Sequence, residues 1–156
     1  MIAGKFAYLG IDVKTNDFVV VLERSDNRRQ LPIWIGNAEA FAIALVSAGI
    51  MPPRPMTHDL LLDVITALGA KLARVVISGL KEKTFYALLH IERGETETYV
   101  IDARPSDSIA LALRAKCEIL MADDIETFDI EFPESDVEKE LANRIRKVEP
   151  QEMIGF

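Results

Sequence analysis

Short runs of alternating or continuously apolar residues open the chain, and similar runs return after its midpoint. The first group covers residues 5–13, 18–23 and 30–35, and polar turns separate its members. This spacing is typical of an antiparallel meander of three strands. The second group predicts four more strands, at residues 71–78, 84–92, 97–102 and 119–121.

Helical periodicity occupies the segments between and after these runs. We expect helices at 38–47, capped by Asn37, and at 58–68, 106–116 and 135–147. The first of them has no polar side chain between Ala40 and Val46. A helix that is apolar all round is buried on every side, either within the chain or between subunits. We therefore predict a homo-oligomer.

The order of these elements predicts a mixed α+β fold, with largely antiparallel sheets and three to four helices in a single domain. We place the domain at residues 1–126. Residues 127–156 then form an acidic tail, in which Ser135 and Glu138 are spaced as a capping box that opens a short amphipathic helix.

Side chains that could bind a ligand or take part in catalysis are concentrated at the start of the second helix. Prolines in the preceding segment, 51–55, keep it extended, so the helix can begin only after them. We expect Thr57 to be its N-cap. Arg54, Thr57, His58 and Asp59 then gather at the positive end of the helix dipole.

The start of the third helix repeats this design. Asp102, Arg104, Ser106 and Asp107 lie just ahead of the apolar run 109–113. Hydroxyl and carboxylate side chains at helix starts can be purely structural. An arginine there opposes the dipole and requires an anion nearby. Two such junctions in one domain suggest that both contribute to one site.

Charge and composition narrow the class of protein. The chain has 156 residues and a net charge of -7. Eleven acidic and four basic residues after position 121 account for all of it, so the body is neutral. The overall acidity disfavours tight non-specific nucleic-acid binding, whereas a neutral body with local arginines disfavours it less. The single Cys117 and the lack of a long apolar run predict a soluble cytoplasmic protein with no membrane segment.

The two junctions together suggest metal-assisted attack on a phosphodiester. Carboxylates suit Mg²⁺ or Mn²⁺, and arginines suit phosphate oxygens. His58 would be the general acid or base, and Arg54 and Arg104 would clamp the phosphate. In the alternative reading, Arg104 pairs with Asp59 or Asp107 in a structural bridge. The candidate metal ligands are Glu39, Asp59, Asp102 and Asp107.

Motifs for dinucleotide binding, zinc ribbons, zincins and common serine hydrolases are absent from the sequence. Four ordered motifs instead resemble the bifunctional nuclease (BFN) domain family over roughly residues 6–126. The resemblance implies a mixed α+β fold, oligomers, and DNase and RNase activity. Lys116-Cys117-Glu118 departs from the proline and apolar residue of many relatives, which affects the expected start of the last strand. The motifs are Leu31-Pro32-Ile33-Trp34-Ile35-Gly36 with Glu39-Ala40, Pro53-Arg54-Pro55 with Thr57-His58-Asp59-Leu60, Thr84-Phe85-Tyr86-Ala87, and Asp102-Ala103-Arg104-Pro105-Ser106-Asp107.

Two other functions remain open from the sequence. The same helix starts could hold a phosphorylated or carboxylate ligand in a regulatory module without turnover. Alternatively, the motifs could serve oligomer assembly in a structural protein. Binding without a metal requirement would support the first alternative, and dissociation on substitution of Arg54 or Asp107 would support the second.

Overall fold

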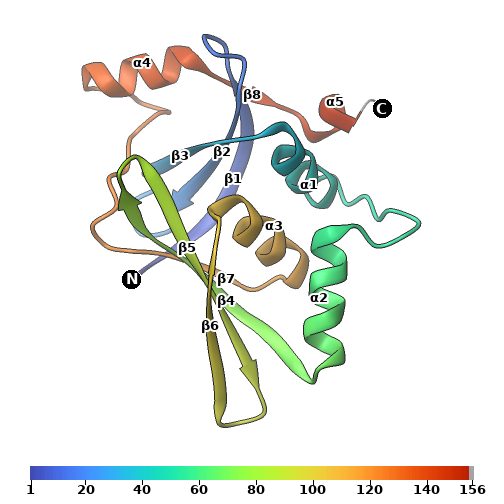
Figure 1. Ribbon diagram of the computed structural model, residues 1–156. Coiled ribbons are helices and arrows are strands. Elements are labelled where there is room, and N and C mark those ends of the chain that lie inside the picture. Colours follow the sequence, from blue (N-terminus) through green and yellow to red (C-terminus); the bar gives the residue numbers. More distant parts are fainter. Residues whose placement is uncertain (155–156) are drawn as a thin grey trace.

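A meander of three antiparallel strands opens the computed structural model, which describes residues 1–154, as the alternation predicts. A second group of strands follows two helices, and the last helices and strand belong to the C-terminal segment (Figure 1). In chain order the elements are β1 (Ile2–Asp12), β2 (Phe18–Arg24), β3 (Gln30–Ile35), α1 (Asn37–Ser47), α2 (Thr57–Ala67), β4 (Ala70–Lys81), β5 (Thr84–Arg93), β6 (Glu97–Ala103), α3 (Pro105–Ala115), β7 (Glu118–Met121), α4 (Asp136–Arg144), β8 (Ile145–Val148) and α5 (Pro150–Ile154).

The strands form one mixed sheet, in the order β3-β2-β1-β7-β4-β5-β6, and β8 pairs with β1 beside this path. Neighbouring strands are antiparallel except β4 and β7, which are parallel. The α+β prediction is therefore confirmed. The chain forms one sheet where separate sheets were expected, because β7 joins the meander to the second group of strands.

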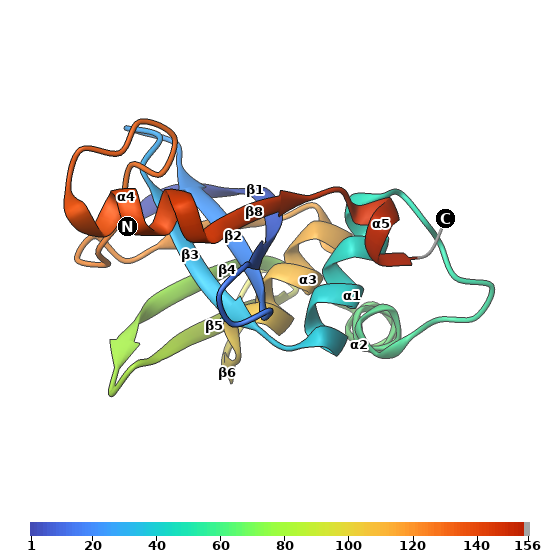
Figure 2. The same cartoon turned by 90° about the horizontal axis from the view of Figure 1, so that it is seen from above.

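Helices α1, α2 and α3 lie on the same side of the sheet, with α3 against β4, β5 and β7 (Figure 2). The main core lies between them and the strands, with Ile43, Ile77, Ile109 and Leu111 fully buried. On the meander's other face, a smaller cluster joins Val19 and Val21 to the C-terminal segment. The sheet is thus covered on both faces at the meander, whereas the β5–β6 hairpin projects from the body (Figure 1).

Local details of the helix starts differ from the sequence predictions. Gly36 caps α1 in place of Asn37, and Met56 caps α2 in place of Thr57. The Asp59 carboxylate accepts a hydrogen bond from the Met56 backbone N–H at 3.0 Å, so this side chain selects the cap one residue earlier. Helix α1 is buried as expected, but against α3, α5 and β2 of the same chain. Its apolar sequence therefore needs no second subunit.

The acidic tail is attached to the sheet. The Ser135 hydroxyl accepts a hydrogen bond from the Glu138 N–H and the Glu138 carboxylate accepts one from the Ser135 N–H, which confirms the predicted capping box. The helix ends at Arg144, because residues 145–148 pair with β1 as strand β8. The prediction of helix to Lys147 is wrong for this reason. Residues 155 and 156 of the predicted tail lie outside the described residues.

Gly10 allows β8 to approach β1 closely. A Cβ atom at this position would lie 2.8 Å from Ile145 Cγ2 and 3.1 Å from the Arg146 backbone oxygen. A side chain cannot fit there unless the strand moves.

No helix in the described part of the chain is long and apolar enough to cross a membrane.

A fully buried carboxylate, Asp12, fixes the junction between the tail and the meander. It accepts hydrogen bonds from Trp34 Nε1 at 2.9 Å, from Arg144 Nε at 2.7 Å and from the Lys14 backbone N–H at 2.9 Å. Burial raises the pKa of Asp12, but these hydrogen bonds outweigh it and lower the pKa to about 2. Asp12 is therefore ionised in the folded protein at neutral pH.

This lowered pKa predicts a pH dependence of stability. An aspartate has a pKa of about 3.9 in the unfolded chain. Because folding lowers it, the contribution of Asp12 is complete above about pH 4 and is lost as the pH falls toward about 2. We expect the free energy of unfolding of Asp12→Asn to lie furthest below that of the wild type near neutral pH. The gap should narrow through this acidic window.

Urea unfolding at a series of pH values, followed by circular dichroism, measures the gap. Asp63→Asn, at an exposed position of α2, is the control. A gap between Asp12→Asn and the wild type that stays constant from neutral to acidic pH would contradict the prediction.

Candidate functional site

The starts of helices α2 and α3 meet, as their repeated sequence design predicts. His58 Nε2 lies 2.9 Å from Asp107 Oδ1, which joins the first turn of α2 to the first turn of α3. Each helix starts where it does for a local reason: extended, proline-rich chain precedes α2, and Pro105 occupies the first position of α3. The sequence therefore brings an imidazole and a carboxylate from two helix starts into direct contact.

Arg104 completes this cluster and connects it to α1. Its Nε lies 2.8 Å from Asp107 Oδ2, and its terminal nitrogens lie 3.2 Å from Asp107 Oδ1 and 2.8 Å from Glu39 Oε1. Gly36 leaves space for the Glu39 carboxylate, which a Cβ atom at that position would meet. The anion required by an arginine at a helix start is thus supplied by the chain itself. We name Glu39, His58, Arg104 and Asp107 the junction cluster.

Electrostatics favour the charged forms of the three ionic members. Burial raises the pKa of Asp107, but hydrogen bonds from Arg104 and His58 outweigh it, so the pKa lies below its usual value. The pKa of Glu39 is lowered by a hydrogen bond from its own backbone N–H and by Arg104. Hydrogen bonds to Asp107 and Glu39 raise the pKa of Arg104 further. Asp107 is therefore an anion that can orient the His58 ring.

Asp59 lies next to His58 in sequence but makes different contacts. Its Oδ1 accepts a hydrogen bond from Arg114 Nε at 2.9 Å, and its Oδ2 caps α2. The largely buried Arg114 side chain also donates to the Ala110 and Ala42 backbone oxygens, both at 2.9 Å. Burial raises the pKa of Asp59, but hydrogen bonds from Met56 and Arg114 leave it lowered overall. These contacts tie α1, α2 and α3 together and favour a structural role for Asp59.

We expect Asp59→Ala to lower the free energy of unfolding by about 1–2 kcal/mol, because it removes both a helix cap and an ion pair. Chemical denaturation of the variant measures this loss. Asp63→Ala, one turn further along the exposed side of α2, should have the stability of the wild type. A stability for Asp59→Ala equal to that of the control would contradict the structural role.

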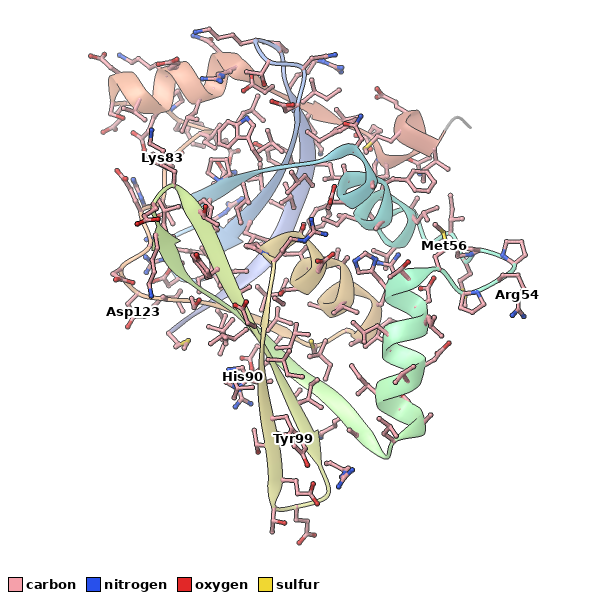
Figure 3. The ribbon with its side chains drawn as sticks, viewed as in Figure 1. Arg54, Met56, Lys83, His90, Tyr99 and Asp123 are labelled. Carbon is pink, nitrogen blue, oxygen red and sulfur yellow. The ribbon has the colours of Figure 1, made fainter. Side chains whose placement is uncertain are left out.

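Other residues predicted for the site lie outside the junction cluster. Arg54 is exposed at the tip of the loop between α1 and α2 and points away from the body (Figure 3). Asp102 is exposed on β6 opposite Leu88, and within residues 1–154 no hydrogen bond joins it to the cluster. Thr57 is exposed and Ser106 is buried, and they line different hollows.

The junction cluster lines a cavity of about 620 Å³ between α1, α2, α3 and the end of β6. Leu61 and Ile101 give this cavity an apolar wall, and Asp102 and Arg114 also line it. Its volume lies within the range of about 300–1,000 Å³ that is usual for ligand sites. The arrangement provides an imidazole, an oriented carboxylate and an exposed guanidinium on one hollow surface.

The carboxylates do not form a metal site in their present arrangement. Within residues 1–154, no group of three or more histidine, cysteine, aspartate or glutamate side chains is placed to hold a metal ion. Arg104 engages oxygens of Glu39 and Asp107, and Arg114 engages Asp59. Each candidate oxygen ligand in these contacts already has a cationic partner.

Arg114 is the residue at this site that the sequence reasoning missed. It lies in the last turn of α3, where a basic side chain is favoured by the helix dipole whatever its partner. Only its position on the same helix as Asp107, two turns later, could have suggested a link to the site. The sequence contains no sign of its contact with Asp59, 55 positions earlier.

Comparison with known proteins gives a family match and several relatives. A family model described as the bifunctional nuclease domain matches residues 20–129, more than half of the chain. An uncharacterized protein of Mycobacterium tuberculosis strain H37Rv is 49% identical over 113 residues, which are 71% of this chain and 66% of that protein. A rice protein named Bifunctional nuclease 1 (Oryza sativa subsp. indica) is 26% identical over 103 residues, 64% of this chain and 31% of the relative. The chain thus spans just under two thirds of the mycobacterial protein and less than a third of the rice protein.

Proposed function

The chain belongs to the bifunctional nuclease domain family, and we propose that it hydrolyses phosphodiester bonds of DNA and RNA. The observation that carries the proposal is the contact of 2.9 Å between His58 and Asp107 beside the exposed Arg104 guanidinium. A positioned base, a group that orients it and a phosphate-binding cation are the parts that such a reaction requires. The name of the rice relative supports the same reaction class.

His58 would transfer the proton in this reaction. If Nε2 carries the hydrogen, it donates to Asp107 Oδ1 and leaves Nδ1 as the basic nitrogen. Asp107 fixes this tautomer and stabilises the imidazolium that forms when Nδ1 takes a proton from the attacking water. The His58 side chain is only 16% exposed, so its ring is held largely within the protein, and it lines the cavity of the candidate site.

Arg104 would bind the phosphate. A guanidinium has five N–H donors, and three of them are used in the contacts with Asp107 and Glu39. The remaining donors belong to a side chain that is 63% exposed, so a phosphate oxygen can reach them. The two carboxylates hold the guanidinium in one orientation, which reduces the entropy lost on binding.

Cleavage of single-stranded DNA and RNA by the purified protein tests the proposal. Reactions contain Mg²⁺, Mn²⁺ or a chelator, because we also propose, from the sequence, that cleavage depends on a divalent cation. Equal cleavage with the chelator would contradict this dependence alone. Asp107→Asn, purified identically, detects a contaminating nuclease. Cleavage that is lost in Asp107→Asn supports the assignment. Equal cleavage by both proteins, or none by the wild type in any condition, would contradict it.

We also propose a homo-oligomer, as predicted from the sequence, but with an interface formed by α2 and β6 in place of the apolar helix α1. The outer side of α2 exposes Leu60, Val64 and Leu68, and the edge strand β6 exposes Tyr99 and Ile101. Exposed apolar groups in this number are typical of an interface. Sedimentation velocity should show an oligomer that Val64→Glu dissociates. Sedimentation of the wild type at the monomer mass throughout a dilution series would refute it. The cytoplasmic location stays a prediction from the sequence.

A regulatory anion-binding module is the second candidate. The free donors of the exposed Arg104 favour it, because they can bind a phosphorylated ligand without any chemistry following. Titration calorimetry with inorganic phosphate distinguishes the candidates. Binding by a protein that cleaves neither DNA nor RNA would favour the module.

A further inference from the structure

A second hollow lies on the other side of Arg104 from the cavity of the candidate site. Its volume is about 370 Å³, and its walls come from the end of β3, from the β4–β5 hairpin and from the start of α3. Arg104 and Glu39 line both hollows, so a ligand in one lies next to the other. Trp34, Lys83 and Phe85 line the second hollow but not the cavity of the candidate site, and Trp34 and Phe85 are shared with a third hollow.

Trp34 is held in a fixed orientation but remains accessible. Its indole Nε1 donates to the buried Asp12 carboxylate at 2.9 Å, and the Arg144 guanidinium lies 5.9 Å from the ring centroid. The residue is nevertheless 39% exposed. An aromatic ring that is fixed from behind and partly open to solvent is suited to stacking, because little side-chain freedom is lost on binding.

Lys83 places a positive charge at the rim of this hollow. It forms the two-residue turn between β4 and β5 with Glu82, and both residues have left-handed backbone angles, with φ of 65° and 49°. Its side chain is at the hairpin tip (Figure 3), and it forms no ion pair with any described residue. Lys83, from the β4–β5 turn, and Arg104, from the start of α3, therefore both line the hollow.

The charge of this hollow differs from that of its neighbour. A larger cavity of about 560 Å³ lies beyond Trp34, but Asp124 and Glu126 line it beside Lys81. Among the described residues that line the smaller hollow, Glu39 is the one carboxylate, and it is already paired with Arg104 at 2.8 Å. A polyanion is therefore favoured in the smaller hollow and opposed in the larger one.

We propose that this hollow binds one nucleotide of single-stranded DNA or RNA, with the base stacked on Trp34 and a phosphate between Lys83 and Arg104. Aromatic stacking combined with cations that follow the backbone is the usual way to bind single strands without base specificity. The adjacent phosphodiester would then enter the cavity of His58 and Asp107. The choice of nucleic acid as ligand rests on the proposed function, whereas the position of the subsite rests on the contacts above.

Trp34 is the only tryptophan of the chain, so its fluorescence reports on a ligand in this hollow or in the neighbouring cavity, which Trp34 also lines. Oligothymidylate, oligouridylate and an abasic oligodeoxynucleotide of equal length are titrated into the protein. The same titrations with His58→Ala remove the effect of cleavage. We expect the two base-containing strands to quench the fluorescence and the abasic strand, which has phosphates but no bases, to leave it nearly unchanged.

Variants measured by the anisotropy of a labelled oligonucleotide separate stacking from charge. Trp34→Ala should weaken binding by at least about fivefold, and Trp34→Phe should retain much of it. Lys83→Ala should lower the slope of affinity against salt by about one. Lys71→Ala, near the opposite end of β4, removes an exposed lysine whose side chain lies 3.8 Å from Glu92, and should match the wild type.

Several results would overturn the subsite. Equal quenching by the abasic strand would exclude stacking, and equal effects of Lys83→Ala and Lys71→Ala would exclude the phosphate contact. Binding by anisotropy or cleavage without quenching would place the strand elsewhere and leave the proposed nuclease function intact. If the wild-type protein neither binds nor cleaves the oligonucleotides, both proposals are overturned.

Discussion

Replacing His58 by alanine is expected to lower the rate of phosphodiester cleavage by about a hundredfold to ten-thousandfold, the contribution usual for a positioned general acid or base. The expectation follows from the contact with Asp107 at 2.9 Å, which orients the ring at the rim of a cavity that also contains Arg104. Single-turnover cleavage of a labelled oligonucleotide measures the rate of the chemical step. The affinity for the strand, measured separately, should change little because His58 does not line the nucleotide subsite.

The chain supplies its own control for this experiment. Its second histidine, His90, lies on β5 opposite Val100 of β6, away from the junction cluster (Figure 3). His90→Ala should therefore cleave at the wild-type rate. Asp59→Ala tests the neighbouring position, and we expect it to lose stability rather than activity. A His58→Ala protein that is folded and cleaves as fast as His90→Ala would remove His58 from the reaction.

Arg144→Ala is expected to have the largest effect on stability, a loss of about 3–5 kcal/mol in the free energy of unfolding. The variant leaves Asp12 fully buried without the guanidinium that lies 2.7 Å from it. The same arginine lies over the Trp34 ring and ends helix α4, so its removal also loosens the tail. The Trp34 and Lys14 donors remain, which places the expected loss toward the lower end of the range.

Arg146→Ala is the matched control, because this residue lies two positions later on β8 with an exposed side chain. It should unfold at nearly the same denaturant concentration as the wild type, since surface substitutions usually change stability by less than about 0.5 kcal/mol. Equal midpoints for the two arginine variants in urea would show that the buried ion pair contributes nothing. The emission maximum of Trp34 should shift only in Arg144→Ala, because only that variant changes the surroundings of the ring.

The sequence predicted elements well wherever a local signal determines them. Alternation identified the meander, and the spacing of Ser135 and Glu138 identified the start of α4. The sequence-based prediction failed where pairing with a strand that is distant in sequence determines the structure. Residues 145–148 continue a helical pattern, yet they form a strand because β1 offers an open edge to them. A short segment with little intrinsic preference adopts the structure that its tertiary contacts favour.

In the candidate site, too, the sequence predicted what local signals determine and missed what distant contacts determine. The repeated Arg-Pro, hydroxyl and Asp design predicted that the two helix starts contribute to one site, and the structure brings His58 and Asp107 into contact. It could not predict which carboxylate each arginine selects, because Arg104 reaches Glu39 across 65 positions. The prolines around Arg54 suggested a residue aimed at the site, but they instead extend a loop that carries it away. Side-chain partners depend on the packing of α1 against α3, which has no local signature.

The pairing of β8 with β1 also affects how the chain must be synthesised. The edge of β1 that does not face β2 is shared, with β7 along residues 2–4 and β8 along residues 9–12. Until residues 145–148 have left the ribosome, the second part of that edge has free backbone donors and acceptors on the outer strand of an apolar meander. Exposed strand edges of this kind pair readily with other chains. A nascent chain that stalls within α4 would therefore be at greatest risk of aggregation. The pairing of β8 removes this risk, because it covers the exposed edge of β1.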